Sequence, residues 1–85
     1  MTNKLFIGNL GFTTDEAQLR TTFETVGALV SAVVVKDRTT GQSRGFGFVE
    51  YRSASDAERA MQSLDGAMLD GRAIRVNVAN ERGAR

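Results

Sequence analysis

Cysteine, histidine, tryptophan and proline are all absent from this chain of 85 residues. Without cysteine there is no disulfide framework and no thiolate metal site, which fits a reducing compartment, and we expect a cytoplasmic location. The lack of histidine removes the commonest metal ligand and the usual general base near neutral pH. We therefore expect no metal, no other cofactor and no enzymatic activity. No apolar run approaches the roughly 18 residues of a membrane span, and no signal peptide is evident, so no membrane association is expected.

What is present is an ordinary globular mixture, with 41% hydrophobic and 25% charged residues, in a length that suits one domain and, by default, a monomer. The net charge is only +1, but it is unevenly distributed. The two segments with helical patterns, 14–26 and 56–65, each carry a net −2, so the strands and loops together carry +5. A basic sheet face would attract a polyanion, whereas acidic helices could equally serve solubility.

The hydrophobic pattern predicts two helices between four strands. Thr13 with Glu16 and Ser55 with Glu58 are typical of capping boxes at the two helix starts, and Gly27 is expected as the C′ glycine of the first helix. The predicted elements, in the order β-α-β-β-α-β, cover residues 4–9, 14–26, 29–35, 46–51, 56–64 and 74–78. This order predicts an α+β fold of the ferredoxin-like type, a four-stranded antiparallel sheet with both helices packed on one face.

Such a fold leaves one face of the sheet without helices, and successive strand residues point to opposite faces. In the first strand Leu5 and Ile7 fit the buried side, which leaves Phe6 on the open face. By the same alternation the last strand places Arg75 and Asn77 on the open face.

The third strand has the most informative alternation. Its predicted buried side, where glycines would let a helix approach closely, consists of Gly45, Gly47, Val49 and Tyr51. The intervening positions put the rings of Phe46 and Phe48 on the open face beside Phe6. A contiguous apolar patch in water indicates a binding site. The alternative is a register shifted by one residue, which would bury the three rings and expose the glycines instead.

These residues lie in two motifs. Residues 44–51, Arg-Gly-Phe-Gly-Phe-Val-Glu-Tyr, match the ribonucleoprotein octamer of RNA-recognition motifs at every position, and residues 5–10, Leu-Phe-Ile-Gly-Asn-Leu, resemble the companion hexamer. The resemblance covers residues 4–79 and divides the chain into a motif domain at 1–79 and a short flexible tail at 80–85. The chain resembles bacterial and cyanobacterial single-domain RNA-binding proteins and the corresponding domain of plant glycine-rich RNA-binding proteins. The plant proteins carry a long glycine-rich tail, of which only Gly83 remains here, so either the tail was cut away or the bacterial type applies; the bacterial type is preferred.

The resemblance implies that the open face binds single-stranded RNA, since a duplex hides its bases. It implies that Phe6 and Phe48 stack on bases, that Phe46 packs against sugars and that Arg44 pairs with a phosphate. Exposed polar residues are expected to add secondary contacts, namely Lys4, Arg38, Arg75 and Asn77. A role as an RNA chaperone or a post-transcriptional regulator follows from the same resemblance.

Three details remain open in the sequence. The loop 36–44, with a net charge of +2, could fold over bound RNA or remain a solvated hairpin loop. Val33 and Val35 could extend the platform onto the second strand or be covered by a neighbour. In the tail, Arg82 and Arg85 could contact phosphates or belong to a frayed terminus.

Three other functions compete with RNA binding. A protein-interaction module of the same fold would use the helices or a degenerate sheet face, but here the aromatic residues are intact. Single-stranded DNA could stack on the same platform, and contacts to the 2′-hydroxyl would decide between the two. Acylphosphatase-like enzymes share the topology, but fold alone does not carry function, and no catalytic constellation is present.

Overall fold

The computed structural model describes residues 3–79, so the predicted tail at 80–85, with Arg82 and Arg85, lies outside the described residues. The elements follow in the order β1 (Lys4–Gly8), α1 (Glu16–Glu24), β2 (Leu29–Lys36), β3 (Ser43–Tyr51), α2 (Ala54–Leu64), β4 (Met68–Leu69), β5 (Arg72–Ala73) and β6 (Arg75–Val78). Within the described part of the chain, neither helix has the length and apolar character that crossing a membrane requires.

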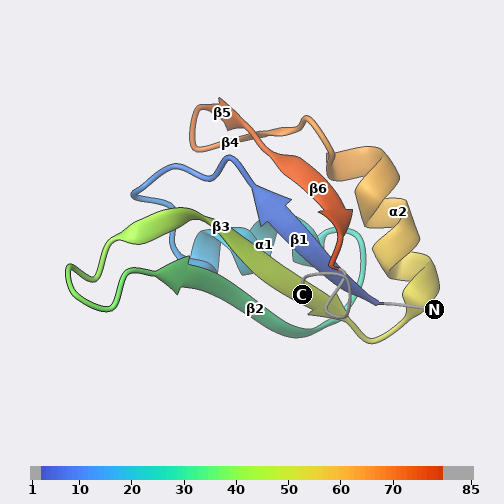
Figure 1. The fold of residues 1–85 in the computed structure, drawn as a ribbon. Coiled ribbons are helices and arrows are strands. Elements are labelled where there is room, and N and C mark those ends of the chain that lie inside the picture. Colours follow the sequence, from blue (N-terminus) through green and yellow to red (C-terminus); the bar gives the residue numbers. More distant parts are fainter. Residues whose placement is uncertain (1–2, 80–85) are drawn as a thin grey trace.

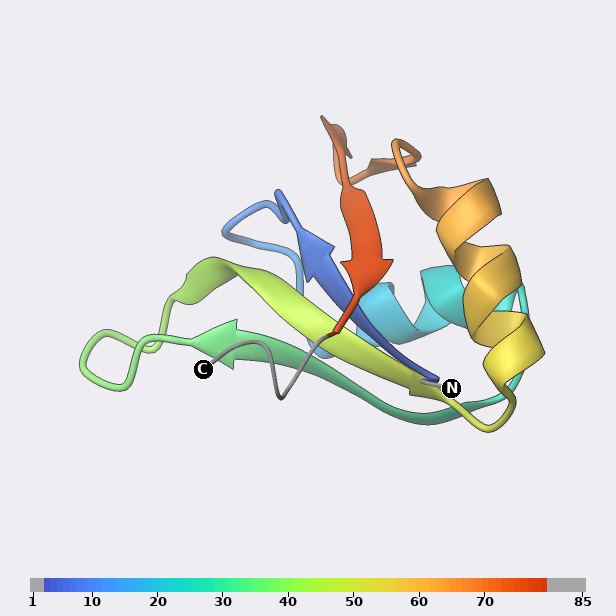
Figure 2. The ribbon, with the colours of Figure 1, turned by 45° about the vertical axis from the view of Figure 1, so that its right-hand side comes forward.

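Four strands form one antiparallel sheet in the order β2-β3-β1-β6, and β4 and β5 form a separate small hairpin. Both helices lie on the same side of the sheet (Figures 1 and 2), and among residues 3–79 no helix or strand covers the other side. The predicted ferredoxin-like fold is therefore confirmed. β1 and β3, the strands that carry the two motifs, lie side by side at the centre of the sheet.

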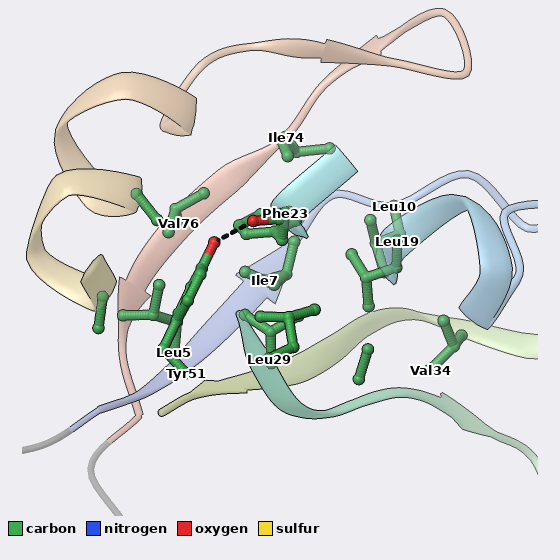
Figure 3. Close-up of a cluster of buried hydrophobic side chains, with 14 residues drawn as sticks. Leu5, Ile7, Leu10, Leu19, Phe23, Leu29, Val34, Tyr51, Ile74 and Val76 are labelled. Carbon is green, nitrogen blue, oxygen red and sulfur yellow. Dashed lines mark hydrogen bonds between the residues drawn. The ribbon is translucent and has the colours of Figure 1, made fainter. Parts of the chain in front are cut away.

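The core lies between the sheet and the helices (Figure 3). Leu5 and Ile7 from β1 meet Leu19 and Phe23 from α1, and all four are fully buried. Tyr51, at the end of β3, is also buried, and its hydroxyl donates a hydrogen bond of 2.7 Å to the carbonyl oxygen of Phe23. Burial, with a smaller contribution from a nearby acidic charge, raises the pKa of the Tyr51 phenol far above its usual range. The phenol therefore stays neutral and acts as a donor between sheet and helix.

Tyr51→Phe is expected to lower the free energy of unfolding by about 1–2 kcal/mol, because the buried carbonyl of Phe23 would lose its hydroxyl donor while the packing of the ring is kept. Urea unfolding followed by circular dichroism measures this. A variant as stable as the parent would mean that the backbone N–H groups that already donate to this carbonyl, that of Val26 at 3.2 Å among them, satisfy it without the hydroxyl.

The start of α1 differs from the prediction. The helix begins after Asp15, whose carboxylate accepts from the backbone N–H of Gln18 at 2.9 Å, while the Gln18 side chain accepts from the N–H of Asp15 at 3.0 Å. The capping box therefore lies two residues after the predicted one at Thr13. The Thr13 hydroxyl instead donates to the Asp70 carboxylate at 3.0 Å. The residue predicted to cap the helix therefore makes a tertiary contact.

The end of α1 and the start of α2 also differ. α1 ends at the cap residue Thr25, and Gly27 lies beyond the helix rather than at its C′ position. A Cβ at Gly27 would come within 2.2 Å of the Asp56 carboxylate, so this glycine allows α2 to approach. α2 is capped by Ser53, which accepts from the N–H of Asp56 at 3.1 Å, and not by Ser55.

The glycines of β3 do not serve the close helix approach that was predicted. A Cβ at Gly47 would come within 2.3 Å of the carbonyl oxygen of Val33, on the neighbouring strand β2. Gly45 has φ +87°, in the left-handed region that favours glycine. β3 begins at Ser43, earlier than predicted. Gly47 lets the backbone of β3 lie close to that of β2, and Gly45 lets it adopt a left-handed conformation.

Candidate nucleic-acid interface

Three phenylalanine rings lie together on the open face of the sheet. Phe6 on β1 is directly opposite Phe48 on β3, and Phe46 is opposite Gly8, two pairs further along. The ring centroids are 5.6 Å apart for Phe6 and Phe46, 5.8 Å for Phe6 and Phe48, and 6.3 Å for Phe46 and Phe48. The three side chains are partly exposed, while Leu5, Ile7 and the other core-side residues are buried. The predicted register is confirmed and the shifted register is wrong. We call these three rings the aromatic platform.

The strands beside the platform extend it in two directions. On the β2 side, Val33 is opposite Phe48 and is 43% exposed, and Val35 is partly buried. Val33 is therefore partly open to solvent, and the apolar surface continues onto the edge strand. On the β6 side, Asn77 is opposite Phe6 and exposed, so polar groups border the platform there.

Basic side chains from three strands surround the platform. Arg75, opposite Gly8 on β6, and Arg44, at the start of β3, are exposed near the end of the sheet where Phe46 lies. At the opposite end, the Lys4 ammonium lies over the Phe48 ring, 5.3 Å from its centroid. Such a cation–π contact places a positive charge at the edge of the platform.

Polar groups on the open face also include an acid and an amide. Glu50 is opposite Lys4 and is partly exposed, so one end of the face carries a carboxylate that would repel phosphate but can accept from base amino groups. The side-chain oxygen of Asn77 accepts from the backbone N–H of Val78 at 3.0 Å. Its amide nitrogen can still act as a donor.

Arg38 lies in the loop between β2 and β3, which extends beyond the end of the sheet (Figure 1), so the structure does not bring it beside the rings. The Asp37 carboxylate accepts from the N–H groups of Thr39 at 2.7 Å and Thr40 at 3.1 Å. These bonds, that of Thr40 first, hold the pKa of Asp37 below its usual value. The loop thus has internal hydrogen bonds and a defined shape, and whether it closes over RNA stays a prediction.

One exposed aromatic residue was not assigned to the interface from the sequence. Phe12, in the loop between β1 and α1, lies in none of the predicted elements, and its side chain is 75% exposed. The signal available in the sequence was a large aromatic residue between glycine and threonine, where a loop ordinarily has small polar residues.

Comparison with known proteins agrees with this geometry. The family model described as RNA recognition motif matches residues 5–75. The chain is 46% identical over 82 residues to glycine-rich RNA-binding protein 4, mitochondrial, of Arabidopsis thaliana, which covers 96% of this chain and 60% of that protein. It is 52% identical over 79 residues to the 28 kDa ribonucleoprotein, chloroplastic, of Spinacia oleracea, which covers 93% of this chain and 34% of that protein.

The chain thus spans less than two thirds of the length of these curated relatives. Both are plant proteins named for organelles, so the preference for the bacterial type and the expected cytoplasmic location gain no support from them. Among solved structures, the second RRM domain of the yeast poly(U)-binding protein Pub1 superposes with a TM-score of 0.85 at 42% identity, over 91% of this chain and 93% of that one. With its two motifs on the central strands and a family match over most of its length, the chain belongs to the RNA recognition motif family.

Proposed function

We propose that this domain binds single-stranded RNA on the open face of its sheet, as a binding module and not as an enzyme. The observation that carries the proposal is the aromatic platform, in which three rings within 6.3 Å of one another lie on the side of the sheet opposite the two helices. Every base has a π-face, so each ring can take a base with little regard to sequence, at about 1–3 kcal/mol per stack.

The site residues have distinct roles in this proposal. Phe6 and Phe48 stack on bases, and Phe46 packs against the sugars between them. Arg44 pairs with a phosphate. Secondary contacts come from the exposed or partly exposed polar residues Lys4, Arg38, Arg75 and Asn77.

Two or three stacks provide a gross few to roughly 9 kcal/mol, of which ordering the RNA strand and losing translational freedom consume a large part. A dissociation constant near micromolar, about −8 kcal/mol, is therefore expected. In this proposal the domain binds as a monomer in the cytoplasm and acts as an RNA chaperone or a post-transcriptional regulator. Relatives named as RNA-binding or poly(U)-binding proteins support the ligand class.

The test is a titration of the isotope-labelled chain with a random single-stranded RNA pool, a matched DNA pool and a duplex RNA. RNA is expected to shift the resonances of Phe6, Phe46 and Phe48, and the duplex is expected to leave them unchanged. A DNA pool that binds as tightly as RNA would make single-stranded DNA an equal ligand. A peptide pool that binds more tightly than any nucleic acid, with shifts confined to the helices, would favour the protein-interaction module instead.

Salt dependence gives a second, independent measurement. With Lys4, Arg44 and Arg75 each neutralising a phosphate, the logarithm of the binding constant should fall with the logarithm of salt concentration with a slope of about −2. That amounts to about a 15-fold loss of affinity between about 50 and 200 mM salt. Arg44→Ala should make the slope shallower by about 0.7, whereas Arg20→Ala on α1 should leave it unchanged. A slope near zero for the parent chain would contradict the proposed phosphate contacts.

A further inference from the structure

Phe12 is the most exposed of the large hydrophobic side chains in the described part of the chain, at 75%. It lies in the loop of residues 9–15, which connects β1 to α1. Single exposed apolar residues are common on protein surfaces and by themselves indicate nothing. Two features distinguish Phe12. Hydrogen bonds hold its backbone in place, and its loop lies at one end of the aromatic platform.

The backbone around Phe12 is fixed in a turn. The N–H of Thr14 donates to the carbonyl oxygen of Gly11 at 3.1 Å, which places Phe12 and Thr13 at the two central positions of that turn. Thr14 itself is buried, and the hydroxyls of both threonines donate to one carboxylate oxygen of Asp70, at 3.0 and 3.1 Å. The turn is thereby tied to the hairpin of β4 and β5, and the ring is presented from a fixed base.

A second set of bonds holds the start of the same loop. The Asn9 side chain donates to the carbonyl oxygen of Ala73 at 2.7 Å, and the guanidinium of Arg72 donates to the side-chain oxygen of Asn9 at 2.7 Å and to its backbone oxygen at 3.2 Å. Asn9 has φ +61°, a left-handed bend that turns the chain away from β1. A loop that is ordered before a ligand arrives loses little entropy on binding.

The turn lies at one end of the aromatic platform. The N–H of Leu10 donates to the carbonyl oxygen of Gly45 at 2.9 Å, so the loop runs beside β3 next to Phe46 before it turns. Phe12 is two residues further on, at most about 7 Å of extended chain. Figure 1 shows the loop leaving the sheet at this end, between the first residues of β3 and the β4–β5 hairpin.

The charges at this end favour a polyanion. Three arginines lie around the loop: Arg72 is bonded to Asn9, Arg75 is opposite Gly8, and Arg44 precedes Gly45 in β3. Two acids also lie at this loop: the Asp70 carboxylate is engaged by two threonine hydroxyls, and the Asp15 carboxylate, at the end of the loop, caps α1 by accepting from the N–H of Gln18. Proteins that bind single-stranded nucleic acids combine aromatic rings, which stack on bases, with positive charges, which attract the phosphate backbone. An exposed ring near exposed guanidinium groups offers both.

We propose that Phe12 is a further base-stacking site, which takes a nucleobase of the same RNA strand after that strand leaves the sheet past Phe46. This inference rests on the proposed function, because it extends the path of the RNA bound to the platform. The footprint on the chain is then longer than the sheet face alone. RNA long enough to cover both surfaces uses Phe12, and RNA that fills only the platform does not.

Two RNA lengths and two variants test this. Oligouridylates of four and eight nucleotides, which form no duplex with themselves, are titrated into the parent chain, Phe12→Ala and Phe48→Ala. Phe12→Ala is expected to weaken binding of the octamer by about five- to a hundred-fold, which corresponds to one lost base stack. The affinity for the tetramer should stay within about two-fold of the parent. Phe48→Ala is expected to weaken both lengths. Val30→Ala, which removes a 52% exposed apolar side chain near the other end of the sheet, is the matched control and should change neither.

The outcomes separate the inference from the proposed function. If Phe12→Ala leaves octamer binding unchanged while Phe48→Ala weakens it, the further site is wrong and the platform stands. Equal losses on both lengths with Phe12→Ala would also overturn the further site, because the residue would then act through the platform. If Phe48→Ala affects neither length, the proposed function itself fails.

A spectroscopic readout identifies stacking directly. The chain has no tryptophan, so Phe12→Trp introduces a single fluorophore at the proposed site. Its emission is expected to be quenched on titration with the octamer and to stay unchanged with the tetramer, and its octamer affinity should match that of the parent. Phe12→Leu keeps an apolar side chain without a π-face and should bind like Phe12→Ala. A leucine variant with full affinity would show that the site buries apolar surface without stacking a base, which contradicts the proposal.

Discussion

Loss of the two central rings, in the double variant Phe6→Ala with Phe48→Ala, is expected to weaken RNA binding by about thirty-fold or more. Two stacks are removed, each worth about 1–3 kcal/mol, so from a micromolar start the remaining dissociation constant would lie at about 30 μM or weaker, up to the millimolar range and beyond detection. Isothermal titration calorimetry measures the parent and both single variants, and chemical-shift titration is suited to the double variant.

The two single variants show whether the rings act together. Phe6 and Phe48 are 5.8 Å apart in an edge-to-face arrangement, with interplanar angle 68°, so removal of one ring leaves the other with less support. Neighbours in contact are commonly non-additive, and the double loss should therefore differ from the sum of the single losses. Phe6→Tyr and Phe48→Tyr together are the conservative control, since they keep both π-faces. A folded double alanine variant that binds like the parent would end the platform mechanism.

The sequence predicted the parts of this domain that depend on alternation and periodicity. The alternation of Leu5 and Ile7 with Phe6 predicted the first two on the buried face and Phe6 on the open face, and the structure has this arrangement. The same holds for the helix predicted at 56–64, where Ala57 and Ala60 of α2 are buried three residues apart, the spacing of one helical face. Such patterns survive folding because the burial of a whole face outweighs any single local preference.

The helix starts and the glycines were predicted less well, and for a common reason. Thr13 fits a capping box by local rules, but it bonds Asp70, which lies 57 positions further along the chain. Asp56 of α2 leaves no room for a side chain at Gly27, and the backbone of Val33 on β2 leaves none at Gly47. In each case the partner is distant in sequence, and local propensity gives way to tertiary contact.

The loop that carries Phe12 shows the same limit for function. Nothing adjacent to it in the sequence indicates that its turn is held by Asp70 or that Leu10 bonds Gly45. The motifs direct attention to β1 and β3, where the rings are. Only the folded chain shows that a fourth phenylalanine is exposed in a loop that is bonded to β3 beside Phe46.

Gly47→Ala is expected to be the most damaging single substitution at the interface for stability, although the residue itself offers no side chain to a ligand. Gly47 is in the central strand β3, opposite Ile7 on β1 and Val34 on β2. An added Cβ would come within 2.3 Å of the carbonyl oxygen of Val33 and 3.2 Å of the Val34 Cα. Both are backbone atoms, so relief requires β2 to move and the β2–β3 hydrogen bonds to lengthen.

We expect a loss of about 3 kcal/mol in the free energy of unfolding, the upper end for overpacking, and a melting temperature lower by about 12–24 °C. Gly41→Ala is the control, because Gly41 has φ +76° and open space around it, so its cost is backbone strain alone, about 1 kcal/mol. Thermal unfolding of both variants measures the difference.

The same substitution connects stability to binding. Val33, the residue that must move, lies opposite Phe48, and Gly47 itself lies between Phe46 and Phe48 in the strand. Any shift of β2 that accommodates the methyl group therefore changes the surroundings of a stacking ring. At a temperature where Gly47→Ala is still folded, its RNA affinity should fall below that of Gly41→Ala. A Gly47→Ala variant that melts with the parent and binds with parental affinity would mean that the strand spacing here is adjustable, and that this glycine of the octamer is not required by the packing of β3 against β2.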